Sequence, residues 1–246
     1  MIQSEAETIA LPGSQSAASL SCAVRWRRSS RARRVSLRID ARAGEVVVTL
    51  PPRAGRRAGM ALLNTHAAWV RERLAALSPH IPFAPGAAVP LGGVPHAIRL
   101  APAEGEGGAA EPAGAWLEPG AIVVPGPVEA LPGRVGAFLR AEARRRIQTL
   151  VTGHAAALGA RPKAIRLKDT RSRWGSCAPD GTLAFSWRLV MAPDWVLDYV
   201  VAHEVAHLKE LNHSDRFWAH VARLTPHRDA AVAWLRDYGP GLLRVG

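Results

Sequence analysis

The sequence predicts an α+β protein, and three observations support this class. Alternating and β-branched residues between 22 and 50 are typical of strands. Apolar residues at three- and four-residue steps over 135–158 and 194–211 are typical of helices. Two further strand-like runs, 164–168 and 182–189, separate these helices. We therefore expect a β-rich N-terminal part followed by a mainly helical part that contains a small sheet.

The composition and its shifts along the chain suggest three regions. Residues 1–21 are rich in Ser, Ala and Gly and show no periodicity, so we expect a loose N-terminal leader. Residues 22–127 form the expected β-rich N-terminal region with one helix, and 128–246 form the expected C-terminal domain. The segment 101–120 (APAEGEGGAAEPAGAWLEPG) reads as an insert of unassigned role.

The elements follow in order from local signals. Pro, Gly, Asp and Asn punctuate the periodic runs, and Gly159 and Gly239-Pro240 are typical helix stops. The expected strands are 22–26, 34–40, 45–50, 97–100, 115–118, 121–124, 164–168 and 182–189. The expected helices are about 56–77, 135–158, 194–211, 214–224 and 228–238.

The chain is strongly basic, with a formal net charge of +12. Between Arg25 and Arg57 there are eleven Arg against two acidic residues, so this segment carries +9. Such a segment attracts polyanions, which makes a nucleic acid or a nucleotide a candidate partner, although a solvated strand face is the plainer interpretation. Few aromatic residues accompany the arginines, which argues against a stacking platform for single strands.

Membrane and redox signals are weak. No run of about 18 apolar residues predicts a membrane span, and the first residues lack the pattern of a secretory signal, so we expect a cytoplasmic protein. The two cysteines, Cys22 and Cys177, form no CxxC pair, which disfavours a disulfide scaffold or a cysteine-rich zinc finger.

The strongest motif is His-Glu-Val-Ala-His at 203–207, within the helix expected from 194. Residues four apart on a helix lie about 40° apart around its axis, so His203 and His207 can direct imidazole nitrogens at one metal ion. Glu204, beside them, is placed to take a proton from a water at that metal. This is the HExxH signature of metal hydrolases, and Zn²⁺ is the ion that imidazole ligands favour.

A catalytic zinc site needs a third protein ligand, and candidates follow the motif. On a continuous helix, His213 would lie about 240° around the axis from His207, on the wrong side. A helix break near Asn212 would bring it back, and Ser214 or Asp215 can begin a new helix. We favour His213. The alternatives that remain open are His220 first, then Asp215, His227 and Asp229.

The segment RSRWGSC at 171–177 lies in an expected loop between two strands. In zinc hydrolases an edge strand near the metal commonly holds an extended peptide. Trp174 could therefore form a wall of the cleft, and Arg173 or Arg171 could bind an anionic group or stabilise an oxyanion. Core packing of Trp174 and solvation of the arginines are the competing interpretation.

These motifs resemble a known family. RSRWGSC (171–177), FSWRLVMAPDWVLDYVVAHEVAHLKELNHSDRFW (185–218) and RRSSRARRVSLRIDARAGEVVVTLPPRA (27–54) are similar to the YgjP-like metallopeptidases, relatives of SprT-like and WLM zincins. The resemblance covers most of 22–240. It implies a minimal zincin-like C-terminal domain, in which a small sheet packs on the HExxH active-site helix. It further implies that His203, His207 and His213 bind zinc and that Glu204 is the catalytic base.

The sequence thus predicts a zinc-dependent hydrolase, with a metallopeptidase acting on a peptide or protein as the first hypothesis. The first alternative is a metal-dependent nucleoside triphosphate pyrophosphohydrolase, whose arginines would hold phosphates. The second is a nucleic-acid-associated protease of the SprT-like type, which would use the Arg25–Arg57 segment.

Overall fold

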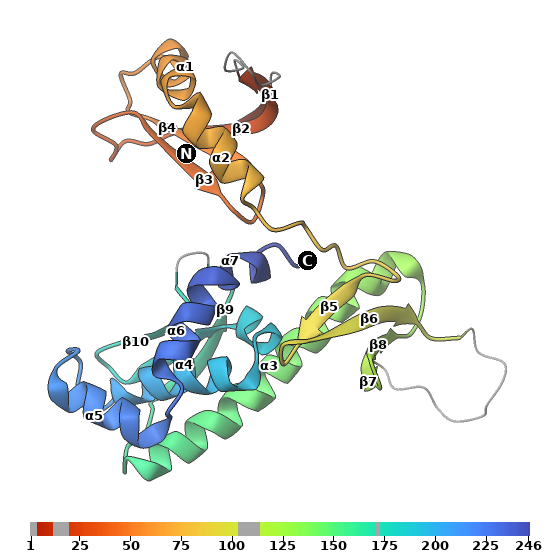
Figure 1. Cartoon of the computed structure of the whole chain (residues 1–246), viewed down its shortest axis with the longest axis vertical. Coiled ribbons are helices and arrows are strands. Elements are labelled where there is room, and N and C mark those ends of the chain that lie inside the picture. Colours follow the sequence, from red (N-terminus) through yellow and green to blue (C-terminus); the bar gives the residue numbers. More distant parts are fainter. Residues whose placement is uncertain (1–3, 12–19, 103–113, 171–172) are drawn as a thin grey trace. The chain divides into compact units, whose positions relative to one another are not determined.

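The computed structural model describes residues 4–11, 20–102, 114–170 and 173–246. Small mixed sheets and helices build an α+β architecture (Figure 1). The chain divides into two compact units, Met1–Pro79 and His80–Gly246.

The first unit is a four-stranded sheet covered by two helices. Its strands have the order β1-β2-β4-β3, in which β2 and β4 are parallel and the other pairs are antiparallel. The β-branched run of β4 lies inside this sheet and supplies Val46 and Val48 to the core. The elements are β1 (Ser4–Leu11), β2 (Leu20–Arg28), β3 (Ser36–Asp40), β4 (Glu45–Leu50), α1 (Arg56–Thr65) and α2 (Ala67–Ala75).

Strand β1 differs from the loose leader that the composition suggested for 1–21. Leu11 is fully buried in the core of this unit, and the Glu7 carboxylate accepts a hydrogen bond of 2.7 Å from the Trp26 indole. Strand β1 is held in place because it pairs with β2 over its whole length. Local composition could not reveal this pairing, because it depends on a strand outside the segment. Residues 12–19 of the expected leader lie outside the described residues. The single helix expected over 56–77 is two, because His66 leaves helical geometry (φ −103°, ψ 18°).

The second unit combines a four-stranded sheet, a three-stranded sheet and five helices in one hydrophobic core. The first sheet has the order β5-β6-β8-β7 and the second the order β10-β11-β9. Its strands are β5 (Ala88–Leu91), β6 (Val94–Leu100), β7 (Trp116–Glu118), β8 (Ala121–Val124), β9 (Ala164–Lys168), β10 (Gly175–Cys177) and β11 (Thr182–Ser186). Its helices are α3 (Leu131–Ala157), α4 (Asp194–Ala206), α5 (Asp215–Leu224), α6 (Arg228–Asp237) and α7 (Gly239–Leu242).

Helix α3 is the longest described helix of this unit, with 27 residues and a length of about 40 Å at 1.5 Å per residue. Its N-terminal half buries Leu131, Val135 and Leu139 in the core that the β5–β8 sheet shares, and its later turns pack against α4. The compact unit that begins at His80 includes this sheet, because the sheet and α3 cover each other's apolar faces. Gly159, with φ 57°, ends the helix as expected.

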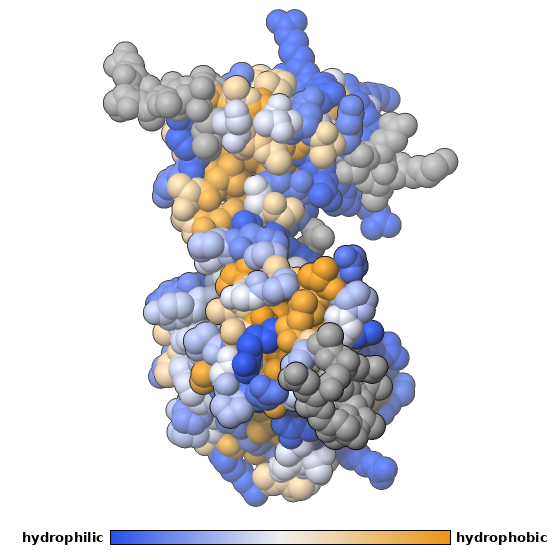
Figure 2. Space-filling view, turned by 90° about the vertical axis from the view of Figure 1, so that its right-hand side faces the viewer, coloured by the Kyte–Doolittle hydropathy of each residue, from blue (hydrophilic) through white to orange (hydrophobic). Residues whose placement is uncertain are grey.

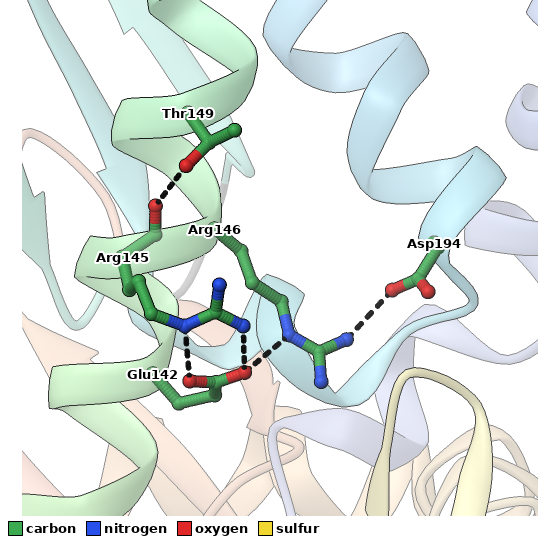
Figure 3. Close-up of polar contacts among 5 residues, drawn as sticks. All are labelled: Glu142, Arg145, Arg146, Thr149 and Asp194. Atoms are coloured by element: carbon green, nitrogen blue, oxygen red, sulfur yellow. Dashed lines mark hydrogen bonds and ion pairs between the residues drawn. The ribbon is translucent and has the colours of Figure 1, made fainter.

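An ionic cluster joins α3 to the start of α4 (Figure 3). Glu142 accepts hydrogen bonds from Arg145 and Arg146, and Arg146 also reaches the Asp194 carboxylate at 2.7 Å. Because Asp194 lies in the first turn of α4, this bridge helps to set the position of the helix that carries the HExxH motif.

Hydrophobic side chains remain exposed on the β5–β8 sheet. Val94, Leu100 and Leu117 are among them, and Figure 2 shows hydrophobic residues on the side of this unit where the sheet lies in Figure 1. Within the described segments, no helix has both the length and the apolar character that a bilayer crossing requires.

Candidate metal centre

The HExxH motif lies at the C-terminal end of α4. His203 and Glu204 belong to its last turn, and His207 is the residue that caps it. The helix is mostly buried, and Glu204 itself is 7 % exposed. Burying a carboxylate beside two imidazoles is costly unless these groups serve a common ligand or a reaction.

The helix ends earlier than the expected residue 211. The backbone amides of Lys209 and Glu210 both donate to the Ala206 carbonyl, at 3.0 and 3.1 Å, and this tight turn stops α4. The chain reverses, and Ser214 then caps α5 by accepting a hydrogen bond from a backbone amide of the new helix. His213 lies between the turn and the cap, so the break that its role requires is present.

The three histidines converge. One possible ligand atom from each of His203, His207 and His213 lies within 4.8 Å of the others. The Nε2 atoms of His203 and His213 are 3.2 Å apart. Two nitrogens at 2.0–2.1 Å from a tetrahedral zinc ion would be about 3.4 Å apart, so this spacing suits a zinc ion. The Nδ1 atom of His207 lies 3.1 Å from the Glu210 carbonyl oxygen, which fixes the ring and leaves its Nε2 for a metal.

Aromatic side chains from α5 hold the imidazoles in place. The ring of Phe217 lies 4.4 to 4.9 Å from all three histidine rings. Trp218 packs on His203 and His213, and the Arg228 guanidinium stacks over Trp218 at 3.6 Å from the ring centre. Phe217 and Trp218 were not among the site residues expected from the sequence, although both lie just after the expected helix cap at Ser214 or Asp215.

The site shifts the pKa values of its groups in the directions that metal chemistry needs. Burial, together with the neighbouring His207 and His213, lowers the pKa of His203 to about 4, and burial lowers the pKa of His207. Both rings are therefore neutral and able to bind a metal near pH 7. Burial raises the pKa of Glu204 to about 7, and the nearby Arg173 opposes this rise.

Gly175, the first residue of β10, makes room for Glu204. A Cβ atom on Gly175 would lie 2.5 Å from the Glu204 Oε1 atom, far inside ordinary contact. The backbone of β10 thus lies directly against the carboxylate, which only a glycine allows. No local sequence signal indicates this contact, because the glycine has a negative φ and lies in a segment that was expected to be a loop.

The predicted substrate-binding residues precede this glycine. Arg173 and Trp174 line one side of a cavity of about 280 Å³, and residues from the C-terminal part of the chain line the other side. Arg171, the other arginine considered, lies outside the described residues. The remaining candidates for a third ligand (Asp215, His220, His227 and Asp229) are absent from the one cluster of metal-ligating side chains that the described residues form.

Comparisons with known proteins show to which family the chain belongs. A family model described as "YgjP-like, metallopeptidase domain" matches residues 33–238. The chain belongs to this YgjP-like family. Three solved chains also match, among them the crystal structure of the metallopeptidase zymogen of Pyrococcus abyssi abylysin. To that structure it is 22 % identical, with a TM-score of 0.33, over 38 % of this chain and 92 % of the other. The curated proteins include no match.

Membership of the YgjP-like family supports a metal-dependent hydrolase of the peptidase type and a peptide or protein substrate. A family of metallopeptidase domains implies a metal ion, and the histidine cluster is a group that could hold one.

Proposed function

We propose that this YgjP-like protein is a zinc-dependent peptidase in which His203, His207 and His213 bind the metal and Glu204 is the general base. The observation that carries the proposal is the convergence of three imidazoles beside one buried carboxylate. Three protein ligands leave a fourth position open, as in catalytic rather than structural zinc sites.

A zinc ion held there would supply Lewis-acid polarisation of a substrate carbonyl and acidify a nearby water. Glu204 would accept the proton of that water and deliver it to the leaving amine. A carboxylate in this position can act as the base in the first transfer and, once protonated, as the acid in the second. Gly175 keeps the carboxylate in place, and the Glu210 carbonyl orients His207.

The test compares wild type, Glu204→Gln and His203→Ala after purification with zinc. Wild type should hold about one zinc ion per chain and release peptides from casein, and a chelator should stop the reaction. Glu204→Gln should keep its zinc and lose nearly all turnover, because the amide cannot accept the proton. His203→Ala should lose both. Full activity of Glu204→Gln would remove Glu204 from the chemistry.

The same assay distinguishes the proposed peptidase from the alternative, a nucleoside triphosphate pyrophosphohydrolase. Nucleoside triphosphates are offered in parallel with casein, and phosphate or pyrophosphate release without peptide cleavage would favour that alternative.

A polyanion partner for the Arg25–Arg57 segment stays a prediction. Part of its charge is used within the first unit, since Arg25 pairs with Glu45 at 2.8 Å and Arg56 pairs with Glu5 and Glu7. Binding of a DNA or RNA duplex that weakens steeply with salt is what this partner requires, because phosphate contacts release counterions. A cytoplasmic location is likewise a prediction.

A further inference from the structure

A cavity of about 280 Å³ in the second unit has two walls from distant parts of the chain. One wall consists of Thr170, Arg173 and Trp174, which precede β10. The other wall comes from the last two helices and the residues that follow them. It consists of Leu235, Arg236, Pro240 and Leu243.

The cavity lies within reach of the proposed reaction centre. Arg173 is two residues before Gly175, and Gly175 lies against the Glu204 carboxylate. A fully extended chain spans at most about 3.6 Å per residue, so no more than about 7 Å of backbone separates Arg173 from that contact.

Strand β10 is also suited to align a substrate with this cavity. It lies at the edge of the β10-β11-β9 sheet and pairs there with β11 alone among the described strands. An extended peptide can add to such an edge through backbone hydrogen bonds, with its side chains directed alternately to either face. A side chain close to the scissile bond would then fall near Arg173 and Trp174.

Among the described residues that line the cavity, the charged side chains are Arg173 and Arg236. The Arg236 guanidinium is occupied by Asp237, with two contacts of 2.7 and 3.1 Å. Arg173 is exposed, and its guanidinium has no carboxylate partner among the residues that the structure describes. The other lining side chains are largely apolar. One available guanidinium above apolar walls fits an aliphatic stem that ends in a carboxylate.

A buried arginine holds both walls together. Arg188 is 1 % exposed and contacts the Asp169 carboxylate at 2.8 Å, directly before the first wall. The same side chain donates to the carbonyls of Leu242 and Val245, at 3.0 and 2.5 Å, on either side of Leu243 in the second wall. A charged group is rarely buried without such partners. The cavity is thus pre-organised rather than a gap between two loose segments.

We propose that this cavity is the substrate side-chain pocket of the enzyme, and that Arg173 selects a substrate with a carboxylate close to the scissile bond. The inference rests on the proposed peptidase function and names its substrate class. The carboxylate belongs either to a Glu or Asp side chain or to the C-terminus of the peptide, and both would use the same charge-assisted contact with Arg173.

The experiment uses the full-length, zinc-loaded protein and a set of octapeptides in which each position in turn is Glu or Gln. Every peptide is made with a free and with an amidated C-terminus. Wild type should cleave the best Glu peptide about tenfold to a hundredfold more efficiently than its Gln partner, the range of one charge-assisted hydrogen bond. A preference that persists in amidated peptides identifies a side chain, and one confined to free C-termini identifies the terminal carboxylate.

Three variants test the role of Arg173. Arg173→Gln should abolish the preference at unchanged zinc content and melting temperature, Arg173→Lys should keep part of it, and Arg173→Glu should reverse it in favour of Lys peptides. Arg166→Gln is the matched control, because Arg166 is an exposed arginine on β9 that does not line the cavity. An equal loss of turnover on all peptides, with the Glu preference intact, would overturn the proposal and indicate a role in the reaction itself.

Binding provides a readout that does not depend on turnover. The affinities of the same Glu and Gln peptides are measured for zinc-loaded wild type and Arg173→Gln by fluorescence titration. If wild type cleaves no peptide, the proposed peptidase function fails, whereas a binding preference that Arg173→Gln removes still supports the pocket. Equal affinity of wild type for the Glu and Gln peptides would overturn the pocket proposal in either case.

Discussion

Gly175→Ala should disable the proposed general base without touching a metal ligand. The added Cβ would lie 2.5 Å from the Glu204 Oε1 atom and 2.8 Å from its carboxyl carbon, whereas ordinary contacts begin at 3.4 Å. Either the carboxylate or β10 must therefore move by about 0.9 Å, the difference between the first and last of these distances. A displacement of about 1 Å at a catalytic group can cost about a hundredfold in rate.

The assay measures kcat/KM on casein-derived peptides together with zinc content and melting temperature. We expect a fall of about a hundredfold, with about one zinc ion per chain retained, because the three histidines lie on α4 and the turn after it. Gly153→Ala is the control, since a Cβ at Gly153 in α3 meets no neighbouring atom within 4 Å. It should leave activity unchanged and should not lower stability.

Nearly full turnover of a folded, zinc-loaded Gly175→Ala protein would refute the reasoning. It would mean that the carboxylate does not act from the position it has beside β10. A loss of zinc in step with activity would also contradict it, because the effect would then pass through the metal site.

Two further predictions concern stability. Hydrogen bonds from Arg145 and Arg146 lower the pKa of Glu142 to about 2, so its folded-state pKa lies below its unfolded value. Glu142→Gln should therefore lower the free energy of unfolding by about 2 kcal/mol at pH 7, a figure reduced to allow for the exposed Arg145. The difference between wild type and variant, measured by guanidinium unfolding, should disappear as the pH falls from about 4.5 towards 2. A difference that is independent of pH contradicts the assignment. Arg188→Met should cost about 3 kcal/mol or more, because buried carbonyls lose a charged donor, and an unchanged melting temperature would argue against that role.

Local sequence signals predicted much of the fold. Strands β3, β4, β8 and β9 and helices α3, α5 and α6 lie close to their expected ranges, since each has a clear period and a Gly, Pro or polar boundary. The motif also indicated which imidazoles could meet, and the structure brings them together once the turn at Lys209–Glu210 reverses the chain.

The features that the sequence did not reveal depend on contacts between distant segments. The pairing of β1 with β2, the contact of Gly175 with Glu204 and the bonds of Arg188 to the C-terminal carbonyls join residues that are 9 to 57 positions apart. None of these residues carries a local pattern that announces its partner. The packing of the β5–β8 sheet on α3 is a further contact of this kind, and both belong to the compact unit His80–Gly246.

The shared core of α3 and the β5–β8 sheet determines where a truncated variant of the second unit can begin. A fragment that starts at 128 would lack the β5–β8 sheet and would expose the apolar side chains of Leu131, Val135 and Leu139 to water. Such a fragment should aggregate during expression. A fragment that starts at His80 keeps that cover and retains the histidine cluster, so crystallisation and metal titration of the second unit should begin there.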